Sequence, residues 1–133
     1  MAQCARVPIQ VALIDDDSSV RKAVSRLLRS HDYVCTVYES AESALTDPAL
    51  SSAQCLVIDI QLSGMNGFAF RDRLLRAGIR IPSLFITGHA DFDSPDWTHS
   101  VGNTPCLQKP FDESQLLSVI EGLLQSGIPV QAT

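Results

Sequence analysis

The sequence predicts an α/β protein, a three-layer α/β/α sandwich built around a parallel sheet. Five short apolar runs, near positions 9–14, 33–38, 55–60, 82–87 and 105–108, alternate with segments of helical character. Runs such as CLVI and SLFI are almost continuously apolar, which is typical of strands that helices cover on both faces. Five such strands joined by right-handed crossovers give the sandwich.

The segment after the first strand is the clearest predicted helix. Its apolar positions have the spacing of one helix face: Val20, Ala23, Val24, Leu27 and Leu28. Its basic positions take the other face: Arg21, Lys22, Arg26 and Arg29. Asp17 or Ser18 would cap the start of this helix.

Three further helices follow from the pattern. The second is expected to begin at Ser40 and to stop before Pro48. The third is expected to end at Gly78, and the last to begin after the cap residue Asp112. The domain is predicted to span residues 1–126, and 127–133 to form a frayed tail.

The connection before the fifth strand, ADFDSPDWTHSVGNTP, does not have the pattern of a regular helix. Pro95 forbids a helix that runs through it, but Ser94 as cap and Pro95 at the first helical position could start a short one. We therefore expect a short or irregular fourth helix of one or two turns.

Composition limits the possible functions. A chain of 133 residues that is 45% hydrophobic has room for one ordinary domain. Its formal charge of −5 argues against nucleic-acid binding as its main task. Because no signal peptide or membrane-spanning run is evident, we expect a cytoplasmic protein without membrane contact. The four cysteines show no C-x-x-C spacing, so neither a zinc site nor a disulfide framework is expected, and Cys55 is interpreted as a buried, reduced thiol.

Polar side chains follow the predicted strands at their C-terminal ends. Asp15 and Asp16 come after VALI, Asp59 after CLVI, Thr87 after SLFI, and Lys109 ends the run in CLQKPF. Because the C-terminal ends of parallel strands open onto one crevice, these groups should converge. Carboxylates a few ångströms apart repel by roughly 4 kcal/mol per pair, so a hard cation such as Mg²⁺ is expected among them.

Each residue taken singly also has a simpler interpretation. The acids at 15 to 17 could merely cap the first helix, and a lone Asp at 59 could be a solvated loop residue. Thr87 could be an ordinary β-branched strand residue. If Asp59 instead faces a metal, it becomes a candidate nucleophile toward phosphorus. Lys109, one of only two lysines in the chain, would then supply a compact charge to phosphate oxygens.

The ordered set IDDD, DIQLSGMNG, FITGH and LQKPF resembles the receiver domain of bacterial two-component response regulators. The resemblance covers nearly the whole chain, and VRK, FITGHAD and KPF are most similar to the FixJ-type subgroup. It implies a CheY-like sheet with strand order 2-1-3-4-5. It also implies a cis peptide bond between Lys109 and Pro110.

The resemblance further implies a role for each site residue. Asp59 would be the phosphoacceptor, and Thr87 and Lys109 would hold the phosphoryl oxygens. Mg²⁺ would be bound by Asp16, Asp59 and the backbone carbonyl of Gln61, with Asp15 helping directly or through water. The implied donor is a sensor histidine kinase or phosphotransfer protein. The implied output is a downstream protein partner or an output domain outside this chain, and the implied state is a monomer or a phosphorylation-dependent homodimer.

The chain departs from the family pattern at several positions. Ser63 replaces the usual proline in the loop after the phosphoacceptor, so this loop is expected to be less rigid. Cys106 stands where the family usually has the Tyr or Phe that reports phosphorylation. The segment around Pro95 replaces the usual fourth helix, where Trp97 could anchor a different partner. His89 flanks the expected phosphoryl position and is either a polar loop residue or an influence on hydrolysis.

Three functions follow. The first is a regulatory receiver, not a turnover enzyme, in which phosphorylation of Asp59 shifts a two-state equilibrium. The second is a Mg²⁺-dependent phosphatase with an aspartyl nucleophile, but haloacid dehalogenase-type enzymes usually carry a second Asp where this chain has Gln61. The third is an interaction module that works without phosphorylation. The altered segment around Pro95, on the surface where the family usually contacts its partners, favours this function. The complete set of acids, hydroxyl and lysine argues against it.

Overall fold

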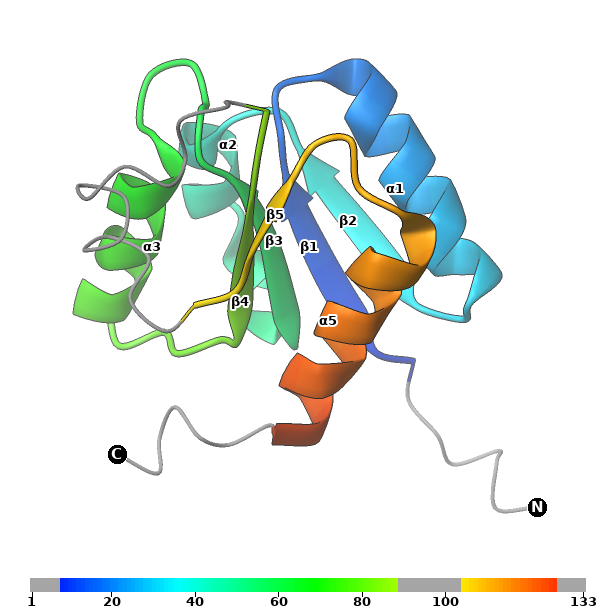
Figure 1. Ribbon diagram of the computed structural model, residues 1–133. Coiled ribbons are helices and arrows are strands. Elements are labelled where there is room, and N and C mark those ends of the chain that lie inside the picture. The colour runs from blue at the N-terminus through cyan, green and yellow to red at the C-terminus, as the bar shows by residue number, and fades with distance from the viewer. Residues whose placement is uncertain (1–7, 89–103, 127–133) are drawn as a thin grey trace.

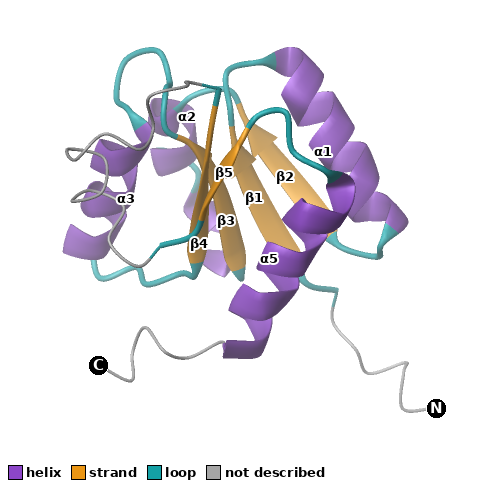
Figure 2. Ribbon diagram, viewed as in Figure 1, coloured by secondary structure: helices purple, strands orange, loops and turns teal. Residues whose placement is uncertain are grey.

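A five-stranded parallel sheet lies between two layers of helices (Figures 1 and 2). The computed structural model describes residues 8–88 and 104–126. The strands are β1 Gln10–Ile14, β2 Val34–Tyr38, β3 Cys55–Asp59, β4 Ser83–Thr87 and β5 Cys106–Gln108. They pair in the order β2-β1-β3-β4-β5, with every pair parallel. The predicted three-layer α/β/α architecture and its strand order are confirmed.

The helices begin where the sequence places capping side chains. They are α1 Ser18–Ser30, α2 Ala41–Leu45, α3 Gly67–Arg76 and α5 Glu113–Ser126. Asp17, not Ser18, caps α1 by accepting from the backbone N–H of Ser19 at 2.9 Å. The second helix, expected to begin at Ser40, begins at Ala41 with Ser40 as its cap, and Asn66 caps α3. At the start of α5 the side chain of Gln115 accepts from the Asp112 N–H at 2.9 Å.

A short 3₁₀-helix, η2 Pro48–Ser52, follows α2 and was not predicted. The side chain of Asp47 accepts from the backbone N–H of Ala49, and Pro48 occupies the first turn, where its missing N–H costs nothing. This short helix buries Leu50 against the sheet. Pro48 therefore ends one helix and begins another.

Alternating strand residues build two apolar layers, one on each face of the sheet. On one face Ile14, Ile58 and Phe85 pack with residues of α2 and α3. On the other face Leu13, Val57 and Ile86 pack with residues of α1 and α5. Strands β3 and β4 are buried at every position, which explains why their sequences show no polar alternation.

The strands end together at one edge of the sheet. Ile14 lies opposite Ile58 in the register of β1 and β3, and Asp59 lies opposite Ile86 in that of β3 and β4. Thr87 lies opposite Gln108 in the register of β4 and β5. The residues that follow these positions therefore enter the same region of space.

Several expectations concern residues outside the described ranges. The short fourth helix, the capping by Ser94, and the positions of His89 and Trp97 all fall within 89–103, and the predicted tail is 127–133. Within the described ranges, no helix is both long enough and apolar enough to cross a membrane. The Cys55 thiol is fully buried, as predicted, and burial raises its pKa to about 12.

Candidate functional site

The C-terminal edge of the sheet gathers three carboxylates and one ammonium group. One carboxylate oxygen from each of Asp15, Asp16 and Asp59 lies within 4.8 Å of the other two. Lys109 comes from the loop after β5, and its ammonium nitrogen reaches two of these acids. The structure thus brings together four of the residues that the sequence placed at strand ends.

Asp15 is fully buried, and its two oxygens have different surroundings. Oδ1 accepts from the backbone N–H of Asp17 at 2.9 Å, which fixes the turn into α1. Oδ2 forms an ion pair with Lys109 Nζ at 2.9 Å. Asp15 Oδ2 is therefore paired with an ammonium group that it shares with Asp59.

Arg21 supports the same turn from α1. Its guanidinium donates to the backbone carbonyl of Asp15 at 2.8 Å. The sequence had placed Arg21 only on the polar face of the helix. Its spacing from Asp15 gave no signal of this contact, because the contact depends on how the chain turns from strand to helix.

Asp59 ends β3 and is only 4% exposed. Its Oδ1 accepts from the backbone N–H of Gln61 at 3.1 Å, and its Oδ2 lies 3.3 Å from Lys109 Nζ. Burial, and then the negative charge of Asp15, raise the pKa of Asp59 to about 6, although the Gln61 N–H and Lys109 oppose the rise. The carboxylate is poorly neutralised in the absence of a further cation.

Lys109 lies between the two buried acids. Burial by itself lowers the pKa of its ammonium group, but the contacts with Asp15 and Asp59 outweigh this effect, and the pKa is raised above its ordinary value. Lys109 is therefore a permanent cation at neutral pH. The Lys109–Pro110 peptide bond is cis, as the resemblance implied.

Asp16 is the exposed member of the acid cluster. Its Oδ2 accepts two hydrogen bonds from Ser63, one from the backbone N–H at 3.3 Å and one from the hydroxyl at 3.1 Å. The sequence had suggested only that Ser63 loses the rigidity of a proline. A contact across 47 positions follows from the adjacency of β1 and β3, which local sequence does not encode.

The loop from Ile60 to Asn66 is held on its other side by α2. The Glu42 carboxylate accepts from the Met65 N–H at 3.0 Å, and this hydrogen bond lowers the pKa of Glu42. Gly64 has φ +79°, and a Cβ there would lie 2.8 Å from Glu42 Oε2. The positive φ, more than this contact with a flexible side chain, is what favours glycine at this turn of the loop.

Thr87 and Gln61 lie at the edges of the acid cluster. Thr87 ends β4, is fully buried, and accepts at its backbone carbonyl from the Lys109 N–H at 2.6 Å. A Cβ at the adjacent Gly88 would lie 3.9 Å from the Lys109 side chain, which is ordinary van der Waals contact. Gln61 follows β3, is exposed, and uses its N–H on Asp59.

The donor set suits a hard divalent cation. The carboxylates of Asp15, Asp16 and Asp59 supply oxygen ligands only, as Mg²⁺ prefers. One ammonium group, that of Lys109, serves both buried acids, and the charge of Asp15 still raises the pKa of Asp59, so a further cation would be favourable beside them. The residues present therefore fit a magnesium ion.

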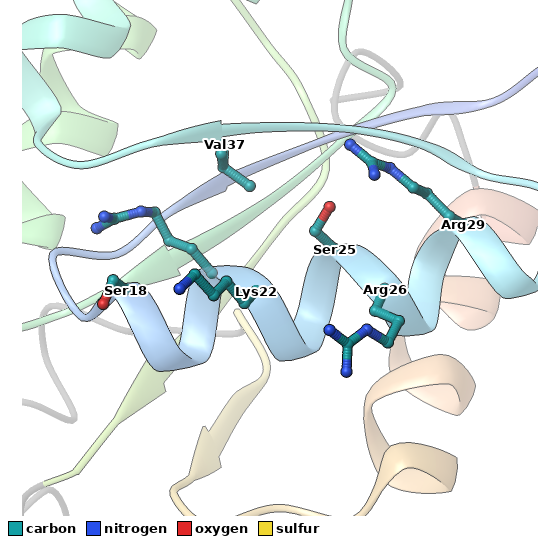
Figure 3. Close-up of a pocket in the computed structure, with 7 residues that line it drawn as sticks. Ser18, Lys22, Ser25, Arg26, Arg29 and Val37 are labelled. Carbon is teal, nitrogen blue, oxygen red and sulfur yellow. The ribbon is translucent and has the colours of Figure 1, made fainter.

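A separate concave region lies between α1 and the edge strand β2. Figure 3 shows that its side chains come from successive turns of α1 and from Val37 on β2. The groove has a volume of about 420 Å³, and its lining is mostly basic: Ser18, Arg21, Lys22, Ser25, Arg26, Arg29 and Val37. It does not include the carboxylates, and its link to them is the Arg21 contact with the Asp15 backbone.

Comparisons with known proteins show the family of the chain. The family model for the response regulator receiver domain matches residues 11–121. Nodulation protein W of Bradyrhizobium diazoefficiens is 33% identical over 110 residues, which cover 83% of this chain and 48% of that protein. Response regulator protein TodT of Pseudomonas putida is 32% identical over 115 residues, which cover 86% of this chain and 51% of that protein. The chain thus spans about half the length of these relatives.

Solved structures show the same likeness. The response regulator StyR superposes with a TM-score of 0.81 at 31% identity, over 95% of this chain and 64% of that one. Full-length FixJ from B. japonicum superposes with a TM-score of 0.79 at 26% identity, over 96% of this chain and 63% of that one. The similarity to FixJ agrees with the subgroup that the motifs indicated.

Proposed function

Because this chain belongs to the response regulator receiver domain family, we propose that it accepts a phosphoryl group on Asp59 in a Mg²⁺-dependent reaction. The observation that supports this best is the placement of Asp59: it is buried, close to Asp15, and 3.3 Å from the Lys109 ammonium group. A structural aspartate has no need of a second buried acid beside it. An aspartate that attacks phosphorus needs a cationic environment to hold the phosphoryl group, and a second buried acid helps to bind the cation that provides it.

In the proposed reaction a carboxylate oxygen of Asp59 attacks the phosphorus of a phosphohistidine. An oxygen–phosphorus bond forms and the phosphorus–nitrogen bond breaks in line with it, so the imidazole leaves with the electron pair and is protonated by solvent. Without metal, the pKa of the Asp59 carboxyl group is about 6. Above pH 6 the group is still mainly ionised and able to attack.

The neighbouring residues stabilise the charge that develops. Asp15, Asp16, Asp59 and the backbone carbonyl of Gln61 would hold Mg²⁺, which when bound draws charge from the phosphoryl oxygens. Lys109 moves its charge from the Asp59 carboxylate to a phosphoryl oxygen as the acyl phosphate forms. The Thr87 hydroxyl and the Gly88 N–H supply further donors at the end of β4.

The proposed biological role is that of a phosphoacceptor, not of an enzyme that turns over a substrate. The donor is a histidine kinase or a phosphotransfer protein. The response is a shift between two conformations that a partner protein, or an output domain outside this chain, detects. Two-component signalling is the process in which such receivers work.

Incubation with phosphoramidate tests the assignment. The wild-type chain should gain one phosphoryl group by intact-mass measurement when Mg²⁺ is present and none when it is chelated. Asp59→Asn should gain none, while Asp47→Asn, which changes an aspartate that caps η2, should react like the wild type. Equal labelling of Asp59→Asn would disprove the phosphoacceptor, and steady release of phosphate from esters would favour the phosphatase.

A further inference from the structure

We propose that Ser63 is a positioning residue of the metal site, which holds the Asp16 carboxylate beside Asp15 and Asp59. This inference rests on the proposed Mg²⁺ site and adds a residue to it. Both donors of Ser63, the backbone N–H and the hydroxyl, converge on one oxygen, Asp16 Oδ2. Two donors from one residue restrain a carboxylate in direction as well as in distance.

Asp16 is the acid that needs such restraint. Asp15 is fully buried and tied to the Asp17 N–H, and Asp59 is buried and tied to the Gln61 N–H. Asp16 is exposed, so its side chain would otherwise be free to rotate among solvated positions. Fixing it in advance lowers the entropy cost of binding a cation, since fewer arrangements of Asp16 must then be given up.

Ser63 is itself held in place by the rest of its loop. The next residue, Gly64, has a positive φ, and Met65 donates to Glu42. At the C-terminal end of the loop, a Cβ on Gly67 would lie 2.5 Å from the Asp59 carbonyl oxygen, so the Gly67 backbone packs directly against the end of β3. The position of Ser63 is thus set by α2 and β3, and Ser63 in turn sets the position of Asp16.

The serine at 63 supplies donors that a proline at the same position would lack. Proline has no N–H and no hydroxyl, so it would leave Asp16 Oδ2 with neither of these hydrogen bonds. In this chain the loop lacks the rigidity of a proline but is hydrogen-bonded directly to Asp16, a proposed metal ligand. Donors that orient metal ligands typically affect metal affinity by about 10- to 100-fold.

Titration with MgCl₂ followed by calorimetry, with no phosphoryl donor present, tests the proposal. Ser63→Ala keeps the N–H and should weaken Mg²⁺ binding by roughly 3- to 10-fold, and Ser63→Pro should weaken it by about 10-fold or more. Ser63→Thr keeps the hydroxyl and should restore most of the affinity. Ser51→Ala, which removes an exposed hydroxyl in η2, should bind as the wild type does.

A second measurement does not depend on metal. In Mg²⁺-free protein, Asp16→Ala should speed hydrogen exchange at the Ser63 amide and leave the Met65 amide, bonded to Glu42, protected. Wild-type affinity in both Ser63→Ala and Ser63→Pro, or tighter binding, would overturn the positioning role while leaving the Mg²⁺ site intact. Failure of the wild type to bind Mg²⁺ would overturn both proposals.

Discussion

Asp59 is expected to reduce the stability of the metal-free protein. Its folded-state pKa of about 6 lies above the ordinary 3.8, so the folded protein binds the Asp59 proton more tightly than the unfolded chain. Stability from this group is present in full below pH 3.8 and is lost as the pH rises through about 6. Replacing Asp59 with a neutral residue removes this loss at neutral pH.

Asp59→Asn should therefore raise the free energy of unfolding of metal-free protein at pH 7. The change in pKa corresponds to about 3 kcal/mol in full, and screening by water at the open edge reduces this to about 1 to 2 kcal/mol. Urea unfolding at pH 7 and at pH 4 measures the effect, which should shrink strongly at pH 4. Equal stabilisation at both pH values would show that it does not arise from ionisation of Asp59.

Lys109 is expected to hold down the pKa of Asp59. Its charge and its contact at 3.3 Å both oppose the rise caused by burial and Asp15. Lys109→Met should therefore raise the pKa of Asp59 above 6 and reduce stability at pH 7 by about 1 to 3 kcal/mol, since two buried carboxylates lose their cation.

Carboxyl carbon chemical shifts followed through a pH titration would report the pKa directly. Lys109→Arg retains the charge and should shift the pKa less than Lys109→Met does. Arg76→Met, which breaks an exposed ion pair with Asp72, should leave the Asp59 titration unchanged. An unaltered Asp59 pKa in Lys109→Met would contradict this assignment of charges.

At the scale of elements, the strands and the longer helices were predictable because their patterns are local. The apolar runs gave all five strands to within one or two residues, and capping residues such as Ser40 and Asp112 gave helix starts. The 3₁₀-helix at Pro48–Ser52 was missed because proline was interpreted only as a stop signal. Asp15, Asp59 and Lys109 could be grouped because parallel strands end at one edge.

The contacts between loops could not be predicted in the same way. Ser63 with Asp16, and Glu42 with Met65, join segments that lie 47 and 23 positions apart. Both contacts depend on the path of the loop after β3, which the positive φ of Gly64 and the tight packing at Gly67 determine. These constraints arise from neighbouring elements and leave no periodic signal in the sequence.

Gly67 should be the least replaceable residue of the loop after β3. An added Cβ would lie 2.5 Å from the Asp59 carbonyl oxygen and 2.9 Å from the Ile60 Cα, both backbone atoms that cannot rotate away. Gly67→Ala should cost about 1 to 3 kcal/mol in the free energy of unfolding, because α3 must move away from β3. It should also weaken Mg²⁺ binding, since the Asp59 backbone moves.

Gly122 provides the matched control for Gly67→Ala. It lies inside α5, where an added Cβ would meet nothing within 4 Å. Gly122→Ala should stabilise the protein by about 0.5 to 1 kcal/mol through the higher helix propensity of alanine. Chemical denaturation of both variants tests the pair. Equal stability changes would mean that the close approach at Gly67 does not constrain the loop.

At the scale of the whole molecule, positive and negative charge are separated. The chain has a net charge of −5, yet Arg21, Lys22, Arg26 and Arg29 line one groove beside α1. The three clustered carboxylates lie at the C-terminal edge of the sheet, with Lys109 as the cation that contacts Asp15 and Asp59. The field at this edge therefore favours a divalent cation, and binding there is linked to the folding of the whole domain.

Mg²⁺ should consequently stabilise the folded chain, and the effect should depend on pH. At a free concentration ten times its dissociation constant, the ion should add about 1.4 kcal/mol and raise the Tm by roughly 4 °C. Protons compete for Asp59, whose pKa is about 6 without metal, so the gain should be smaller at pH 5 than at pH 7.5. Differential scanning calorimetry with MgCl₂, EDTA and NaCl of equal ionic strength separates binding from screening. Asp15→Asn should lose most of the gain, because it removes the fully buried ligand. A Tm increase that NaCl reproduces, or that Asp15→Asn retains in full, would place the cation elsewhere on the molecule.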